Sequence, residues 1–122
     1  MSSVRFQVTF DCAEPAVLAA FWAEVFSYPP PLVLDDDHAI IGDPNGVQAP
    51  LFFQRVPESK IVKNRVHLDV HNGDGPGREP QIDAEAKRLV GLGARRMHSV
   101  DDNAAGYFVV MQDPEGNEFC LD

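Results

Sequence analysis

Apolar and polar positions follow two different periods in the first half of the chain. Residues 4–10 alternate in type, which predicts a strand with one buried face. From about residue 16 to residue 26, large apolar side chains recur every three or four positions, which predicts a helix. Pro15 suits the first turn of this helix, and the prolines at 29–31 end it. Shorter β-rich segments follow at residues 32–34, 39–41 and 51–56.

The second half of the chain repeats this order of elements. Residues 5–8 match residues 65–68 in type, so that Gln7 corresponds to His67. The turn sequence Asp-Pro-x-Gly also occurs twice, at 43–46 and at 113–116, each time between predicted strands. We interpret both turns as structural, because proline presets the backbone and glycine supplies a left-handed position. The predicted elements of this half are strands at 65–70, 95–100, 107–111 and 119–121 and a helix at 82–92, after a loop at 71–80.

These patterns predict an α+β fold made of two βαβββ units. The units cover about residues 1–57 and 64–122, with a linker at about 58–63, and we expect residues 1–122 to form a single domain. The helix of each unit covers one face of its sheet and leaves the other open. Pairing the open faces would give a partly closed, barrel-like mixed sheet with the helices outside and a small-molecule cleft inside.

Composition and charge exclude several classes of partner. The chain has 122 residues, of which 44% are hydrophobic, and a formal net charge of −9. This charge argues against binding to nucleic acid or to an anionic membrane surface. Apolar runs stay well short of the roughly 18–20 residues that a membrane span needs, and the N-terminus has no signal-peptide pattern. We therefore expect a cytoplasmic protein in which Cys12 and Cys120 are free thiols.

The sequence resembles the vicinal oxygen chelate superfamily, which includes glyoxalase I, bleomycin-resistance proteins and extradiol dioxygenases. It is most similar to the small glyoxalase-like domain proteins, and the similarity covers nearly the whole chain. The resemblance implies the same paired βαβββ fold, and it also implies a homodimer. The residues that carry it are 19–22, 51–57, 63–69, 93–95 and 113–119.

The resemblance also implies positions for metal ligands on the first and last strand of each unit. Metalloenzymes of the family place His or Gln on the opening strands and Glu on the closing strands. Carried over by position, these places hold Gln7, His67, Gln54 and Cys120. A slip of one residue would put Phe53 in place of Gln54. This set contains no carboxylate, so we expect no tightly bound catalytic metal, with a divalent ion left as an alternative.

Three functions remain open at this point. The first is binding of a small molecule in a metal-free cleft. The second is a lyase, isomerase or dioxygenase acting on a small oxygenated or aromatic substrate, with His67 as metal ligand or general base. The third is sequestration of a drug, as bleomycin-resistance proteins do. We also expect the neighbouring carboxylates Glu118 and Asp122 to raise the pKa of the Cys120 thiol. The residues predicted to line the cleft are Gln7, Phe52, Gln54, His67, Met111 and Cys120.

Overall fold

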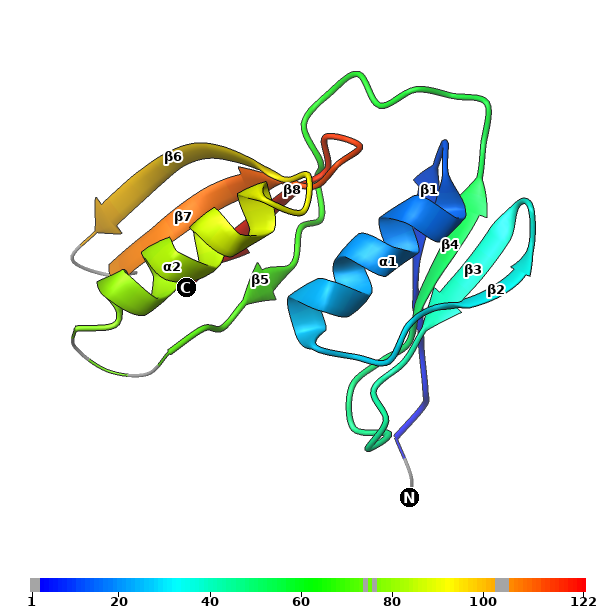
Figure 1. Cartoon of the computed structure of the whole chain (residues 1–122), viewed down its shortest axis with the longest axis horizontal. Coiled ribbons are helices and arrows are strands. Elements are labelled where there is room, and N and C mark those ends of the chain that lie inside the picture. The colour runs from blue at the N-terminus through cyan, green and yellow to red at the C-terminus, as the bar shows by residue number, and fades with distance from the viewer. Residues whose placement is uncertain (1–2, 74, 76, 103–105) are drawn as a thin grey trace. The chain divides into compact units, whose positions relative to one another are not determined.

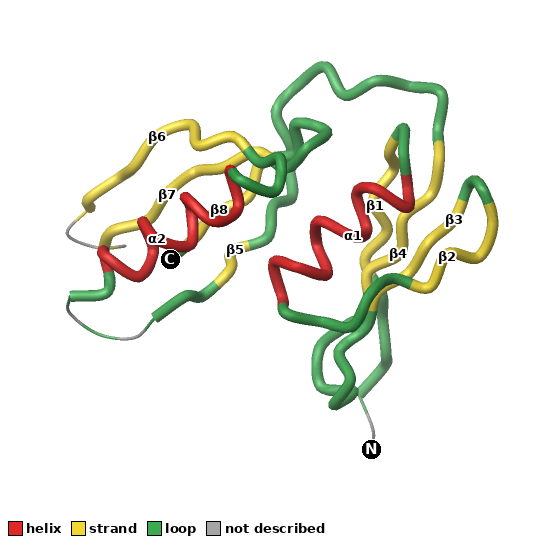
Figure 2. Tube along the Cα trace, viewed as in Figure 1, coloured by secondary structure: helices red, strands yellow, loops and turns green. Residues whose placement is uncertain are grey.

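A computed structural model describes residues 3–73, 75, 77–102 and 106–122 (Figure 1). The chain divides into two compact units, Met1–Ser59 and Lys60–Asp122. Among the described residues, each contains one helix and a four-stranded mixed sheet. Figure 2 shows where these helices and strands lie along the chain. This confirms the predicted α+β class. That the two units act together as one domain, with a cleft between them, stays a prediction.

The sheet of the first unit has the strand order β1-β4-β3-β2, with β1 parallel to β4 and the other neighbours antiparallel. Its helix packs on β3 and β4, and Leu18 and Trp22 of the helix and Ala39 and Phe53 of the strands are at most 1% exposed. Pro15 is the first residue of this helix, as predicted. The bounds are β1 Val8–Cys12, α1 Pro15–Phe26, β2 Leu32–Asp35, β3 His38–Ile41 and β4 Leu51–Arg55.

The second unit repeats the arrangement with the order β5-β8-β7-β6, β5 being parallel to β8. Its opening strand is much shorter than the predicted strand at 65–70, because the ladder with β8 begins only at Asp69. The helix starts three residues before the predicted position, with proline again in its first turn. The bounds are β5 Asp69–Val70, α2 Glu79–Val90, β6 Arg95–Asp102, β7 Gly106–Gln112 and β8 Glu118–Leu121. Among the described residues, neither helix has the length and apolarity of a membrane span.

Strand register shows that the duplication holds residue by residue. In the first unit Ile40 pairs with Phe52, and Phe52 also pairs with Thr9. In the second unit Val110 pairs with Cys120, which also pairs with Asp69. The shift of 70 residues between the turns at 43–46 and 113–116 relates Ile40 to Val110. Phe52 is therefore the counterpart of Cys120, in place of the Gln54 expected from the sequence, and Thr9 is the counterpart of Asp69. The shift of 60 residues that relates Thr9 to Asp69 also relates Gln7 to His67, as the sequence predicted.

The second Asp-Pro-x-Gly turn is held by a buried carboxylate. Asp113 is 2% exposed, and its Oδ1 accepts hydrogen bonds from the backbone N–H groups of Glu115 and Asn117. Its Oδ2 accepts a further one from the Asn117 side chain at 2.8 Å. Gly116 has φ of 88°, a left-handed value that favours glycine. These contacts support the structural interpretation of the turn.

Candidate functional site

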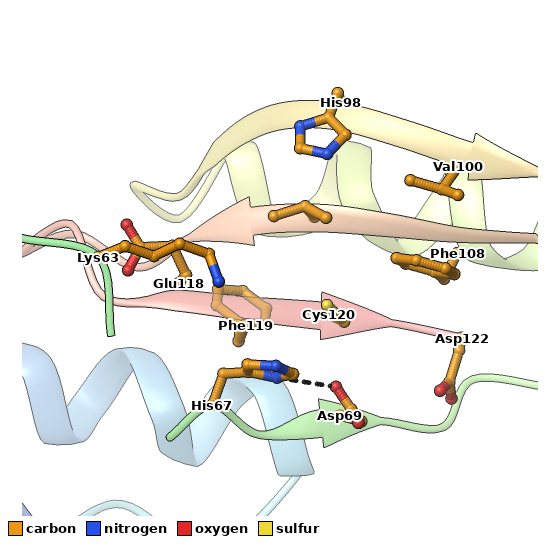
Figure 3. Close-up of a pocket in the computed structure, with 11 residues that line it drawn as sticks. Lys63, His67, Asp69, His98, Val100, Phe108, Glu118, Phe119, Cys120 and Asp122 are labelled. Carbon is orange, nitrogen blue, oxygen red and sulfur yellow. Dashed lines mark hydrogen bonds and ion pairs between the residues drawn. The ribbon is translucent and has the colours of Figure 1, made fainter. Parts of the chain in front are cut away.

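A pocket of about 470 Å³ lies on the face of the second unit's sheet that α2 leaves open. The face under α2 carries the fully buried side chains of Val109 and Leu121. The next side chains along the same strands point the opposite way, because side chains alternate along a strand. Val110 and Phe108 accordingly line the pocket, together with Val100 of the neighbouring strand. Figure 3 shows Val100 and Phe108 side by side at its apolar wall.

Three polar side chains converge on this pocket, one from the segment just before β5 and one each from the adjacent strands β5 and β8. His67 Nδ1 lies 3.1 Å from Asp69 Oδ1, and Asp69 is the pairing partner of Cys120 in the sheet. One nitrogen, one oxygen and one sulfur from these side chains all lie within 4.8 Å of one another. Because an ionised carboxylate only accepts hydrogen bonds, Nδ1 is the donor to it. In the neutral form of the imidazole this leaves Nε2 as an acceptor.

The environment keeps the Cys120 thiol protonated. Burial raises its pKa to about 11, and the charge and hydrogen bond of Asp69 and the charge of Asp122 act in the same direction. Lys63 opposes them. The raised pKa of Cys120 agrees with the expectation from the sequence, and Asp122 contributes to it as expected. Glu118, the other carboxylate expected to raise this pKa, is not among the causes.

Glu118 ties the segment that precedes His67 to the closing strand. Its carboxylate accepts hydrogen bonds from the backbone N–H of Asn64 at 2.8 Å and from the Gln112 side chain at 3.1 Å. It also pairs with the Lys60 ammonium at 3.0 Å. Burial acts to raise the pKa of Glu118, but these contacts outweigh it and lower the pKa to about 2. The carboxylate therefore fixes the start of the segment that carries Lys63 and His67 to the pocket.

Of the predicted cleft residues in the second unit, the structure brings His67 and Cys120 together at the pocket. Met111 is fully buried on the side of β7 that α2 covers. Its neighbour Val110 lines the pocket instead. The alternation along β7 accounts for this difference, since a shift of one residue moves a side chain to the other face.

The predicted residues of the first unit lie on or beside the open face of its own sheet. Phe52 and Gln54 alternate with the buried Phe53, so the predicted face of Gln54 agrees with the strand. The Gln54 amide donates a hydrogen bond to Asp11 at 2.7 Å. Gln7 is exposed and precedes β1. That these three side chains contribute to a ligand site stays a prediction.

Asp69 was missed by the sequence reasoning. The set of predicted ligands lacked a carboxylate, yet the structure places one against both His67 and Cys120. The signal was present, because residues two apart on a strand share a face, and Asp69 follows His67 by two positions. The resemblance implies only one ligand position on each strand, and Asp69 is not at that position.

The sequence profile of the glyoxalase-like domain family matches residues 7–121. The chain belongs to this family. No curated protein sequence matches it. Among solved structures, the domain is similar to a glyoxalase/bleomycin resistance protein/dioxygenase family enzyme from Burkholderia phytofirmans PsJN, with a TM-score of 0.73 and 16% identity over 94% of both chains. It is also similar to the fosfomycin resistance protein FosX from Listeria monocytogenes (TM-score 0.72, 13% identity, 99% and 93% of the two chains).

A lactoylglutathione lyase from Agrobacterium tumefaciens also matches, with a TM-score of 0.65 and 14% identity over 99% of this chain and 93% of that chain. At such identities these likenesses show the fold alone. A mutant of the Listeria protein was solved with Mn(II). The glyoxalase-like domain described here does not offer a matching donor set. Mn(II) prefers oxygen-rich sites, whereas His67, Asp69 and Cys120 supply one carboxylate, one imidazole and one protonated thiol.

Proposed function

We propose that this glyoxalase-like domain binds a small organic molecule on the open face of the second unit's sheet, without the catalytic centre for a hard metal ion. The observation that carries the proposal is the pocket itself. Its volume of about 470 Å³ lies in the range of ~300–1,000 Å³ typical of small-molecule sites. An apolar wall faces a small group of convergent polar side chains, which is the usual composition of such a site.

The metal-free part of the proposal follows from Cys120. Its thiol occupies the closing-strand position at which the resemblance implies a glutamate, and a neutral thiol is a poor ligand for a hard divalent ion. We expect metal analysis of the purified protein to find no stoichiometric Mn(II). Mn(II) retained in a ratio of one per chain after dialysis would contradict this part.

The pocket is tested by filling it. We expect Val110→Trp to abolish binding of the fragments that a ligand-observed NMR screen finds for the unmodified protein, because the indole would occupy the apolar wall. Val90→Trp is the matched control, since Val90 is exposed on α2, which covers the opposite face of the sheet. Equal binding of the fragments to both variants would contradict the proposed location.

A second candidate function is proton transfer by His67. The hydrogen bond with Asp69 favours it, because a carboxylate on Nδ1 fixes the tautomer and leaves Nε2 available as a general base. In such an enzyme we expect His67→Ala to abolish turnover and Asp69→Asn to reduce it strongly. Turnover of a small oxygenated or aromatic substrate that survives His67→Ala unchanged would remove this candidate.

We further propose that the chain acts as a homodimer in the cytoplasm. The family resemblance supports the dimer, and the free thiols of Cys12 and Cys120 are compatible with a reducing compartment. Sedimentation equilibrium is expected to give twice the chain mass of 13.4 kDa. A monomer across the micromolar range would contradict the dimer.

A further inference from the structure

We propose that two copies of this chain associate through the outer strands of their sheets, with β2 of each copy lying along β6 of the other. This inference rests on the proposed homodimer and names the surfaces that form it. Each of the two strands is the last of its sheet, and its outer side carries no strand among the described residues (Figure 1). The backbone N–H and C=O groups on such an edge can pair with a strand of another chain.

The edge strand of the first unit presents an apolar surface to solvent. Leu32, Val33 and Leu34 are 62%, 51% and 53% exposed. Edge strands that stay unpaired are protected by charged side chains, and these three consecutive positions carry none. Val33 also lines a groove beside the start of α1, together with the exposed Val17. β2 therefore offers both a free backbone edge and apolar contacts to a partner.

The edge strand of the second unit complements β2 in charge. β6 begins with Arg95 and Arg96 and has Asp101 near its other end. In β2 the order is reversed, because the apolar residues come first and the acidic turn at 35–37 follows them. An antiparallel contact places this acidic turn beside the basic start of β6, whereas a parallel contact would place it toward Asp101. Charge therefore favours the antiparallel orientation.

The irregular positions of the two strands set the register. The pairing of β2 with β3 skips Leu34, and the pairing of β6 with β7 skips Met97. When these two residues face each other, the new antiparallel ladder is disturbed at one place instead of two. Counting from this pair, the same register sets Asp36 opposite Arg95, so that opposite charges meet at the end of the contact.

Asp36 and Arg95 are the charges best placed to recognise the other copy, since both are exposed. Arg96 already has an ion pair within its own unit, at 3.1 Å. Asp35 and Asp37 also pair within their own unit, at 2.8 Å and 3.0 Å. Surface ion pairs contribute little to affinity. The pair of Asp36 and Arg95 therefore sets the orientation of the contact, and the apolar residues supply its strength.

The charges of the two units favour this contact over one between two copies of β2. Residues 1–59 include eight acidic and two basic residues, whereas residues 60–122 include eleven acidic and eight basic ones. Two first units would therefore repel each other more strongly than a first unit repels a second unit. A two-fold axis repeats the contact, so a closed pair of copies contains it twice.

The contact also concerns the proposed ligand site. His98 and Val100 of β6 line the pocket of the second unit. A strand laid along β6 continues the sheet beside these two residues. The β2 strand of one copy therefore borders the pocket of the other.

The test identifies which thiols meet between two copies of the full chain. One population carries Leu34→Cys and an affinity tag, and the other carries Met97→Cys. The two are mixed while reduced and then oxidised mildly, and peptide mass spectrometry distinguishes the introduced thiols from the native ones. We expect a disulfide that joins position 34 of one population to position 97 of the other. Val90→Cys replaces Leu34→Cys in the matched control, since Val90 is 47% exposed on α2, and it should give no such link.

Charge reversal gives an independent test. Asp36→Arg and Arg95→Asp should each weaken the dimer by roughly 5–30-fold in sedimentation equilibrium, because each dimer contains the pair twice. The double variant should restore the affinity to within about twofold. A link between two Leu34→Cys chains, or a double variant as weak as the single ones, would overturn the proposal. A dimer of the unmodified protein without the expected link removes this surface and leaves the proposed homodimer standing, whereas a monomer removes both.

Discussion

The contacts of Glu118 predict a pH-dependent contribution to the stability of the second unit. The folded state lowers its pKa from 4.5 to about 2, and its side chain is only 13% exposed. At 1.36 kcal/mol for each pKa unit, this difference sets a ceiling of about 3.4 kcal/mol. Its Lys60 partner is 22% exposed, so screening by water reduces the expected contribution to about 1–2 kcal/mol.

The sign follows from the lowered pKa. The contribution is fully present above pH 4.5 and is lost as the pH falls toward 2, because the proton then binds more readily to the unfolded chain. Glu118→Gln cannot ionise, so we expect it to be about 1–2 kcal/mol less stable at pH 7 and to lose this part of the acid dependence. Glu58→Gln is the control, since Glu58 is exposed in the segment that precedes Lys60.

The assay must report on the second unit, and Trp22 lies in the first. Urea unfolding followed by tryptophan fluorescence is therefore unsuitable on its own. Amide hydrogen exchange of Asn64 is direct, because that N–H donates to Glu118. At pH 7 we expect its exchange to accelerate by roughly 5–30-fold in Glu118→Gln, which corresponds to 1–2 kcal/mol. Equal exchange in both proteins, with an unchanged acid dependence, would refute the reasoning.

Three further predictions concern the core, a turn and the thiol. Trp22→Ala should destabilise the first unit by about 3–5 kcal/mol, since Trp22 is 1% exposed and packs edge-on against Phe10. Urea unfolding followed by circular dichroism measures this loss, and a loss below about 1 kcal/mol would contradict the prediction. Asp113→Ala should lower the free energy of unfolding by about 1–3 kcal/mol in the same assay, because it removes the acceptor of the N–H groups in the turn. As a control, Asp36→Ala should change the free energy of unfolding little, since Asp36 is exposed. Iodoacetamide should alkylate Cys120 slowly at pH 7.5 and faster toward pH 11, as followed by mass spectrometry; rapid labelling at neutral pH would show that the thiol pKa is not raised.

The sequence was sufficient for the order of elements because each element carries its own period and its own boundary residues. Pro15 marks the start of α1, and the paired turns identify the repeat. The sequence was insufficient to predict the bounds of β5 and the side of β7 that faces the pocket. The first depends on where β8 begins to pair, and the second depends on which strand face α2 covers. Both are tertiary facts that local patterns do not encode.

The two units have kept the same buried positions while their open faces have diverged. Ala39 corresponds to Val109 and Phe53 to Leu121, and all four side chains are fully buried under the helices. Substitutions there are limited to apolar residues, because a polar side chain would lose its hydration without gaining a partner. The open faces carry no such constraint, which allows Cys120 to stand where the first unit has Phe52.

This difference between the faces supports the proposed ligand site in the second unit. On the open face of the first sheet, Phe52 lies beside His38, with their rings 5.7 Å apart. Phe108 is the counterpart of His38, and it lines the pocket of the second unit together with ionisable groups. An apolar platform persists on both faces, and it suits the flat, apolar part of a ligand. The second face adds the Cys120 thiol beside the His67 imidazole and the Asp69 carboxylate, so the proposed ligand site depends on these side chains rather than on the duplicated scaffold.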